Sequence, residues 1–238
     1  MEKNNDQNSI EQTILIEGEK INLKEYEKEE GGGFYYKKNI DFNNEKYNLI
    51  GVGCRYKVLL SVYSVGMYCN IIPSELSVQN SIEKILSSES KKILLLKIYR
   101  EIDILTMTSA LNNAFKKRID TRKSENKKVT DNLIYLEWIL KKYINGGLKQ
   151  NDELVFEWDK NKINIYIGKN DKEINNSYFY EKIKDNLTPS NKFKKIGEVE
   201  DANICKILFD CYLDKNSVTS DIKYSINKFI LNLSGNEK

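Results

Sequence analysis

Imidazole chemistry is excluded for this chain, because none of its 238 residues is histidine. Catalytic triads of the Ser-His-Asp or Cys-His type, histidine-ligated haem and histidine-rich zinc sites all need that side chain. The four cysteines show no Cys-x-x-Cys spacing and lie in apolar stretches, which predicts buried, reduced thiols. We therefore expect no metal site and no cofactor, and chemistry must come from other polar side chains.

Arg55, Lys57, Tyr63 and Tyr68 are the candidate site residues, and all four lie within one strand-like run. Arg55, Lys57 and Tyr63 share strand parity, so they can face the same side of a sheet. Tyr68 has the opposite parity unless Gly66 hosts a bulge. In one straight strand Arg55 and Tyr63 would lie roughly 26 Å apart. They can meet one ligand only if the chain folds back or bends between them.

The run that carries these residues has the strongest strand pattern of the chain. Residues 52–69 are dense in β-branched and aromatic residues. This composition predicts one long strand, or two strands with a bend at Gly66 or near Leu60.

The rest of the chain predicts an α+β fold, an antiparallel sheet with helices packed on one face. Further strands are expected at 13–18, 20–23, 34–36, 47–50, 92–99, 153–159 and 162–168. Helices are expected at 74–86, 103–119, 131–145, 178–186, 201–213 and 219–231.

Two of these segments carry specific expectations. Helix 131–145 has Thr130 or Asp131 as its N-cap and two glycines after its end. Its apolar stripe predicts a core face made of Leu133, Leu136, Ile139, Leu140 and Ile144, with Trp138 beside it. The 153–168 hairpin alternates polar and apolar residues, which predicts one face in water.

Length and charge indicate how the chain is organised and which partners it has. The length predicts one sizeable domain with smaller additions, or at most two small domains. The net charge is only +3, and the basic run 116–128 has no interleaved aromatic residues, so we interpret it as a solvated helix end rather than a nucleic-acid site. The sequence shows neither a membrane-spanning apolar run nor a secretory leader. We expect an intracellular protein, cytoplasmic or organellar.

Residues 51–68 resemble the early core motif of the chalcone isomerase family. The matching stretches are Gly51-Val-Gly53-Cys-Arg55 and Ser61-Val-Tyr63-Ser-Val-Gly66-Met-Tyr68. That motif reads Gly-x-Gly-x-Arg, a variable strand, then Val-Tyr or Phe-Thr followed by Ala/Ser-x-Gly-x-Tyr. Four later segments resemble the family in the same order, and the likeness extends over residues 47–230. They are residues 96–102, 130–145, 154–168 and 207–218. The resemblance therefore implies one domain at 47–238, preceded by an N-terminal extension at 1–46 with acidic and Gly-rich segments.

The resemblance implies an open-faced β-sandwich with a ligand cleft between sheet and helices. The family contains isomerases, which close a chalcone to a flavanone, and non-catalytic members that bind fatty acids. Arg55 matches the arginine that supports a phenolate in the former and a carboxylate in the latter. Tyr63 stands where the isomerases carry threonine, and the segment Ala110–Phe115 offers asparagine but no match to their catalytic tyrosine. These departures favour binding over catalysis.

We therefore expect non-catalytic binding of a long-chain fatty acid or a similar amphipathic carboxylate. Its head group would meet Arg55 and Tyr63, with Tyr68 and Lys57 as further candidates. Its tail would lie between the sheet and the helices. Candidate lining residues are Leu60, Val62, Leu94, Leu96, the 111–115 segment and the 133–144 segment.

Two other functions remain open. The chain could be an intramolecular lyase of the chalcone isomerase type, in which Arg55 offsets oxyanion charge and Tyr63 donates a hydrogen bond. It could instead be a structural protein whose own side chains fill the cleft. At the level of single residues, Arg55 could form a structural ion pair, Tyr63 could be an ordinary sheet aromatic, and Lys57 could be an edge lysine.

Overall fold

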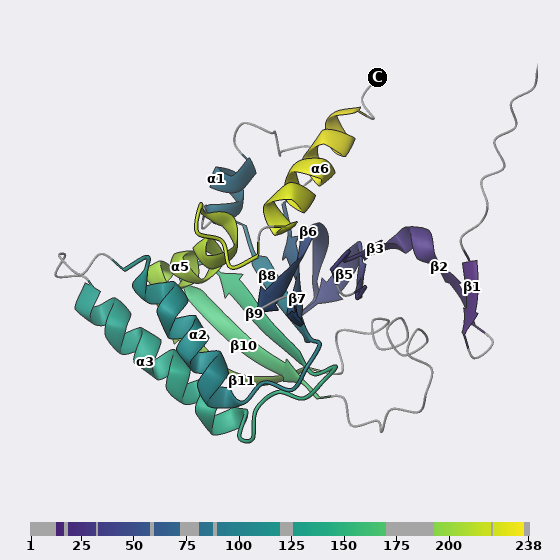
Figure 1. The fold of residues 1–238 in the computed structure, drawn as a ribbon. Coiled ribbons are helices and arrows are strands. Elements are labelled where there is room, and N and C mark those ends of the chain that lie inside the picture. Colours follow the sequence, from purple (N-terminus) through teal and green to yellow (C-terminus); the bar gives the residue numbers. More distant parts are fainter. Residues whose placement is uncertain are drawn as a thin grey trace, which may run out of the picture.

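A single antiparallel sheet, with helices packed on one face, organises the computed structural model (Figure 1). Adjacent strands in this sheet are antiparallel throughout, in the order β11-β10-β9-β8-β7-β6-β5. The structure describes residues 13–16, 19–31, 33–57, 60–71, 81–87, 90–119, 126–169, 193–219 and 221–235.

The strands of the main sheet are 4 to 13 residues long. They are β5 (Asn39–Phe42), β6 (Glu45–Lys57), β7 (Leu60–Cys69), β8 (Lys92–Ile98), β9 (Glu153–Asp159), β10 (Lys162–Gly168) and β11 (Phe193–Glu200). Two small antiparallel pairs precede them. These pairs are β1 (Thr13–Ile16) with β2 (Glu19–Asn22), and β3 (Tyr26–Lys28) with β4 (Tyr35–Lys37).

The helices pack mainly on the face that carries the larger buried cluster. They are α1 (Ser81–Leu86), α2 (Ile104–Lys116), α3 (Asn126–Tyr143), α5 (Ala202–Leu213) and α6 (Asp221–Gly235), with a short 3-10 helix at Leu23–Glu25. Asp103 and Asp201 cap α2 and α5 by accepting hydrogen bonds from backbone N–H groups of the first turn.

Two clusters of buried apolar side chains form on the two faces of the sheet. The helix-side cluster joins strand residues such as Val65 and Leu94 to helix residues such as Leu136. The second cluster forms on the opposite face around Tyr36 and Tyr68. Because successive side chains of a strand point to opposite faces, one strand supplies both clusters. Both faces of the central strands are therefore buried.

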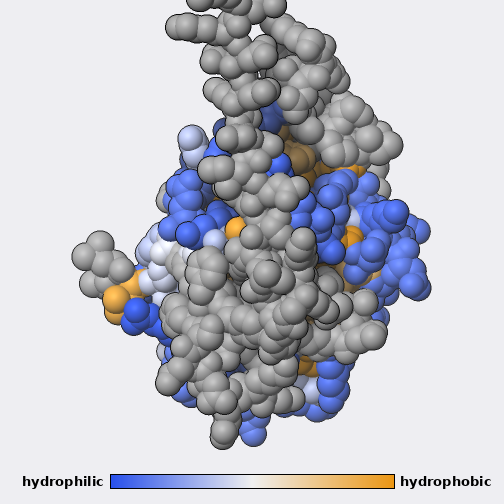
Figure 2. Space-filling model, turned by 90° about the vertical axis from the view of Figure 1, so that its right-hand side faces the viewer, coloured by the Kyte–Doolittle hydropathy of each residue, from blue (hydrophilic) through white to orange (hydrophobic). Residues whose placement is uncertain are grey.

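Figure 2 shows the side of the molecule that lies at the right in Figure 1. The described residues visible there are mainly hydrophilic, and the hydrophobic ones form small separate groups between them. This distribution is typical of a surface that contacts water.

The predicted α+β class, with an antiparallel sheet and helices on one face, is confirmed. The 52–69 run forms β7 and the last six residues of β6, with the chain folding back between Lys57 and Leu60 rather than at Gly66. The domain boundary expected after residue 46 lies inside β6, which pairs with β5. The helix expected at 178–186 lies outside the described residues.

The predicted start of α3 was wrong. The helix begins at Asn126, so Thr130 and Asp131 lie in its interior rather than at its N-cap. The extra turn brings Val129 into the buried stripe, four residues before Leu133. The sequence also gave no indication of β5 or of β11, the two edge strands of the sheet.

The prediction that one face of the β9–β10 hairpin is wet was also wrong. Glu157 lies on that face and is 4% exposed. Its carboxylate accepts hydrogen bonds from the hydroxyls of Tyr47, at 3.0 Å, and Tyr166, at 2.9 Å, and from the Asn164 amide at 3.1 Å. A buried carboxylate is stable when such donors replace water. The polar residues of the β9–β10 hairpin therefore form a buried hydrogen-bond network instead of a face in water.

Lys92 is a fully buried lysine at the start of β8. Its ammonium lies 3.9 Å from the centroid of the Trp158 ring and donates to the carbonyl oxygens of Ser87 and, at 2.6 Å, Ser90. Burial lowers the pKa of Lys92 from 10.5 to about 8. Keeping this side chain charged at neutral pH therefore costs stability.

Replacing Lys92 with methionine tests that cost. Below a pH of about 8, Lys92 is protonated in both the folded and the unfolded state, and the cost is fully present. As the pH rises towards 10.5, the unfolded state binds more protons than the folded state, so stability rises. We expect the free energy of unfolding of wild type, relative to Lys92→Met, to increase by up to about 3 kcal/mol across this interval. Urea titrations at several pH values measure it, and a pH-independent difference would contradict the assignment.

Candidate functional site

The β6–β7 hairpin places Arg55 directly opposite Tyr63. The two residues are register partners in the antiparallel pair, although eight positions separate them in the sequence. Directly opposed residues have Cβ atoms about 5 Å apart. The chain thus folds back between Arg55 and Tyr63, which is the condition for both side chains to contact one ligand.

The two glycines before Arg55 explain why it lies where it does. A Cβ at Gly51 would be 2.5 Å from Cγ1 of Ile226, and one at Gly53 would be 3.0 Å from the backbone nitrogen of Ile222. Both of these neighbours belong to α6, so the glycines allow α6 to approach β6 closely. Arg55, two positions further along the strand, extends past the start of that helix.

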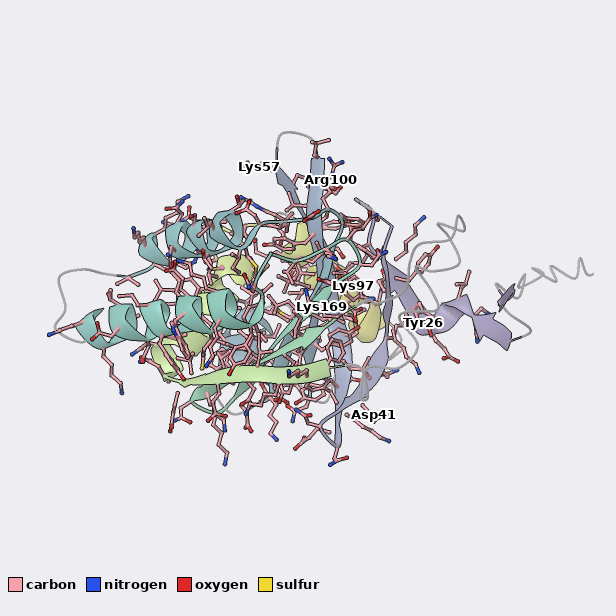
Figure 3. The ribbon with its side chains drawn as sticks, turned by 90° about the horizontal axis from the view of Figure 1, so that it is seen from below. Tyr26, Asp41, Lys57, Lys97, Arg100 and Lys169 are labelled. Atoms are coloured by element: carbon pink, nitrogen blue, oxygen red, sulfur yellow. The ribbon has the colours of Figure 1, made fainter. Side chains whose placement is uncertain are left out.

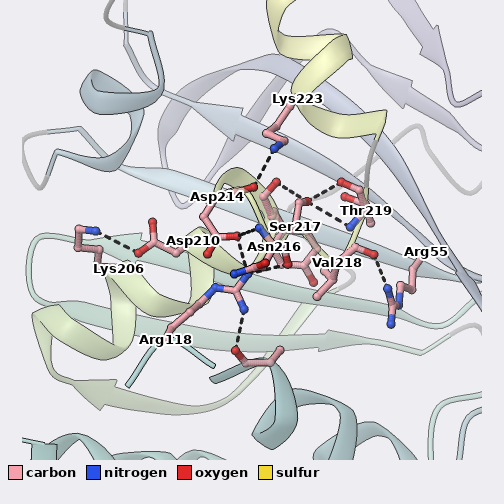
Figure 4. Close-up of polar contacts among 12 residues, drawn as sticks. Arg55, Arg118, Lys206, Asp210, Asp214, Asn216, Ser217, Val218, Thr219 and Lys223 are labelled. Carbon is pink, nitrogen blue, oxygen red and sulfur yellow. Dashed lines mark hydrogen bonds and ion pairs between the residues drawn. The ribbon is translucent and has the colours of Figure 1, made fainter. Parts of the chain in front are cut away.

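The Arg55 guanidinium donates a hydrogen bond from Nη1 to the carbonyl oxygen of Val218 at 2.7 Å (Figure 4). Val218 lies in the connection between α5 and α6. Among the residues that the structure describes, no carboxylate forms an ion pair with Arg55. Its described partner is therefore a neutral carbonyl, which leaves the positive charge without a described counter-ion.

Tyr63 points to the helix side of the sheet, where its hydroxyl lies 3.3 Å from that of Tyr212. Burial raises the pKa of Tyr63, although the hydrogen bond from Tyr212 and the charge of Arg55 partly oppose the rise. Burial also raises the pKa of Tyr212 well above its ordinary value. Both phenols are thus neutral at physiological pH, and each can donate a hydrogen bond to an anion.

Half-buried apolar side chains of α2 pack against the same cluster as Tyr63. Met107 and Leu111 belong to this group, and Val218, in the connection between α5 and α6, packs against the same cluster. A fixed cation and two phenol donors therefore lie at the margin of an apolar region. This arrangement fits a ligand that joins an anionic head to an apolar tail.

The other residues proposed for the head group lie elsewhere. Tyr68 is 1% exposed and lies in the cluster on the opposite face of the sheet. Lys57 is exposed at the end of β6, at the same outer end of the sheet as Arg100 (Figure 3). The structure therefore brings together Arg55 and Tyr63, but neither Tyr68 nor Lys57 joins them.

The candidate lining residues also divide into two groups. Leu94 and Leu96 are buried in the helix-side cluster, as are all five residues of the 133–144 stripe. Leu60 is 48% exposed, and Val62 is half-buried at a bulge in the β6–β7 register. Leu60 and Val62 belong to neither buried cluster.

Tyr212 is a site residue that the sequence analysis did not single out. It lies in α5, within the 207–218 segment whose resemblance to the family was noted. A tyrosine next to apolar positions in a motif-matched helix was the available signal. Its proximity to Tyr63 depends on how α5 packs against the sheet.

Arg118 was also missed, because the basic run 116–128 was interpreted as a solvated helix end. Its side chain is only 6% exposed and forms an ion pair with Asp214 at 2.7 Å. It also donates to the carbonyl oxygens of Ala114, at 2.6 Å, and Asn216, at 2.9 Å (Figure 4). Arg118 thus ties the end of α2 to the α5–α6 connection. Its spacing from Leu111 and Phe115, on the apolar face of the helix, was a usable signal.

The described part of the chain carries neither a metal-binding cluster nor a membrane-spanning helix. No group of three or more His, Cys, Asp or Glu side chains is placed to hold a metal ion there. No helix within the same ranges has the length and apolar content needed to cross a bilayer. The four cysteines are buried free thiols, as the sequence predicted.

Replacing Arg118 with methionine should destabilise the fold by about 3 kcal/mol, because it removes the charged partner of Asp214 and the donor to two carbonyl groups. Chemical denaturation measures the loss. Arg100→Met is the matched control, since Arg100 is exposed and donates to one carbonyl, that of Ser61. Equal stabilities of the two variants would show that the ion pair and hydrogen bonds of Arg118 contribute nothing to the free energy of unfolding.

Comparison with known proteins identifies the family and the fold of the chain. A model of the chalcone isomerase-like family matches residues 28–185. Among solved structures, a fatty-acid binding protein of Arabidopsis thaliana superimposes with a TM-score of 0.63 at 17% sequence identity, over 89% of this chain and 100% of that chain. A search of curated proteins finds no match. The structural likeness shows the fold, and the family match covers more than half of the sequence. The chain belongs to the chalcone isomerase-like family.

Proposed function

We propose that this protein binds a long-chain fatty acid, or a similar amphipathic carboxylate, without catalysing a reaction on it. The observation that carries the proposal is the Arg55 guanidinium, which has a neutral carbonyl partner and lies opposite the Tyr63 phenol. The solved structure of the same fold that is described as a fatty-acid binding protein supports the choice of ligand.

The head group would exchange a neutral partner of Arg55 for a charged one. A carboxylate forms shorter and stronger hydrogen bonds with guanidinium than a carbonyl does, and it can accept two of them in parallel. The phenols of Tyr63 and Tyr212, both kept protonated, supply further donors. Because desolvating both charges offsets much of their attraction, the head group fixes the orientation of the ligand more than its affinity.

The apolar tail would supply most of the affinity. Burying a methylene group contributes about 0.8 kcal/mol, so a tail of about ten methylenes outweighs one ion pair. Met107 and Leu111 offer partly exposed apolar surface on the helix side, where Tyr63 also lies. The tail would therefore run from Arg55 along the helix-side face of the sheet.

Titration of the protein with laurate, followed by calorimetry, tests this function. We expect Arg55→Ala to weaken laurate binding about tenfold or more, because it removes the charged fork. Tyr63→Phe should weaken it several-fold, as one hydrogen bond is lost. Arg100→Ala is the matched control, because Arg100 is exposed at the same end of the sheet, and it should bind laurate as wild type does.

Three outcomes of that experiment would reject the proposal. They are an absence of laurate binding by wild type, equal affinities of wild type and Arg55→Ala, and conversion of a chalcone in an absorbance assay. Thermal unfolding of each variant shows whether it is folded. Arg55→Lys, which keeps the charge but not the planar fork, should fall between wild type and Arg55→Ala.

A further inference from the structure

The outward face of α3 carries large apolar side chains that the core does not use. Ile134 is 59% exposed, Tyr135 is 47% exposed and Trp138 is 49% exposed. The rings of Tyr135 and Trp138 stack on each other at a centroid distance of 5.7 Å. The opposite face of the same helix is buried through residues such as Leu136 and Leu140. This helix therefore has a second apolar face, formed by Ile134, Tyr135 and Trp138, which we call the α3 outer face.

Lysines lie at both ends of the α3 outer face. Lys127 and Lys128 are exposed in the first turn, and Lys141 and Lys142 are exposed in the last turn. The Lys142 ammonium lies 4.6 Å from the centroid of the Trp138 ring.

The helix also contains two acidic residues, Asp131 and Glu137. Glu137 accepts a hydrogen bond from Asn112 of α2 and pairs with Lys141, so it is turned towards the neighbouring helix. Four lysines thus outnumber the acids around an apolar and aromatic centre.

This combination matches the chemistry of a lipid head-group region. Tyrosine and tryptophan favour a membrane surface because their rings are apolar and their polar atoms meet water. Lysine extends its alkyl chain over apolar surface and its charge towards lipid phosphates. A protein partner would require about 800 Å² on each side, which exceeds what one three-residue stripe offers. Shallow insertion into a bilayer surface needs only such a stripe.

We propose that the α3 outer face adsorbs on an anionic lipid bilayer, with Trp138, Tyr135 and Ile134 at head-group depth and the four lysines against lipid phosphates. Figure 1 shows α3 on the outside of the helical layer, beside α2. The helix-side face that carries Arg55 and Tyr63 would then be turned towards the bilayer. This inference goes beyond the proposed carboxylate binding and is tested separately from it.

Co-sedimentation with vesicles of phosphatidylcholine containing about 30% phosphatidylserine provides the test. We expect wild type to bind these vesicles at least about tenfold more strongly than vesicles of phosphatidylcholine alone, and to be released at about 0.5 M salt. Trp138→Ala should weaken binding about fivefold or more, and Lys141→Gln with Lys142→Gln by a similar factor. Tyr224→Ala is the matched control, since Tyr224 is 70% exposed on α6, and it should bind as wild type does.

Trp138 also provides a direct readout. The chain has two tryptophans, and Trp158 is 2% exposed, so a vesicle-induced shift of fluorescence to shorter wavelength reports on Trp138. Three results would overturn the proposal: no vesicle binding, equal binding by Trp138→Ala, or Trp138-dependent self-association without lipid. Laurate affinity of Trp138→Ala should equal that of wild type, which keeps this test distinct from the carboxylate site.

Discussion

Close packing of α6 on the glycine strip of β6 is the constraint on which the candidate site depends. Gly51 and Gly53 let the helix backbone approach the strand, and Arg55 is the first residue of that face to extend beyond the helix. Larger side chains at the glycine positions would push α6 away and separate Arg55 from the Val218 carbonyl. The Gly-x-Gly-x-Arg pattern therefore does two things: its glycines let α6 pack closely on β6, and its spacing positions Arg55 beyond that helix.

The site is assembled from segments far apart in the sequence, each held by its own contacts. Tyr63 comes from β7, Tyr212 from α5 and Val218 from the connection that follows. Arg118, at the end of α2, secures that connection through Asp214 and Asn216. Because burial raises the pKa of both phenols, Tyr63 and Tyr212 stay protonated across the physiological pH range.

The sequence predicted the elements that local patterns specify, and it did not predict the contacts that form only between distant segments. The β6–β7 pair and the core stripe of α3 follow from composition and periodicity, so they were predicted. The burial of Glu157 and Lys92 depends on partners from other elements, and no local pattern specifies such partners. The helical spacing of Arg118 indicated its face, but not its ion pair with Asp214. The exposed edge strand β11 lacks a regular apolar alternation, so its pairing with β10 could not be inferred. Tyr212 was within a noted segment, but its contact required the tertiary fold.

The family match ends at residue 185, whereas α5 and α6 begin at Ala202 and Asp221. Tyr212 and Val218 therefore lie outside the matched residues, although their segment resembles the family, whereas Arg55 lies within the match. A relative that matched residues 28–185 but differed in these helices would keep the cation and lose the phenol and the carbonyl beside it. Membership of the family therefore does not by itself imply the proposed head-group contacts, which depend on both stretches of the chain.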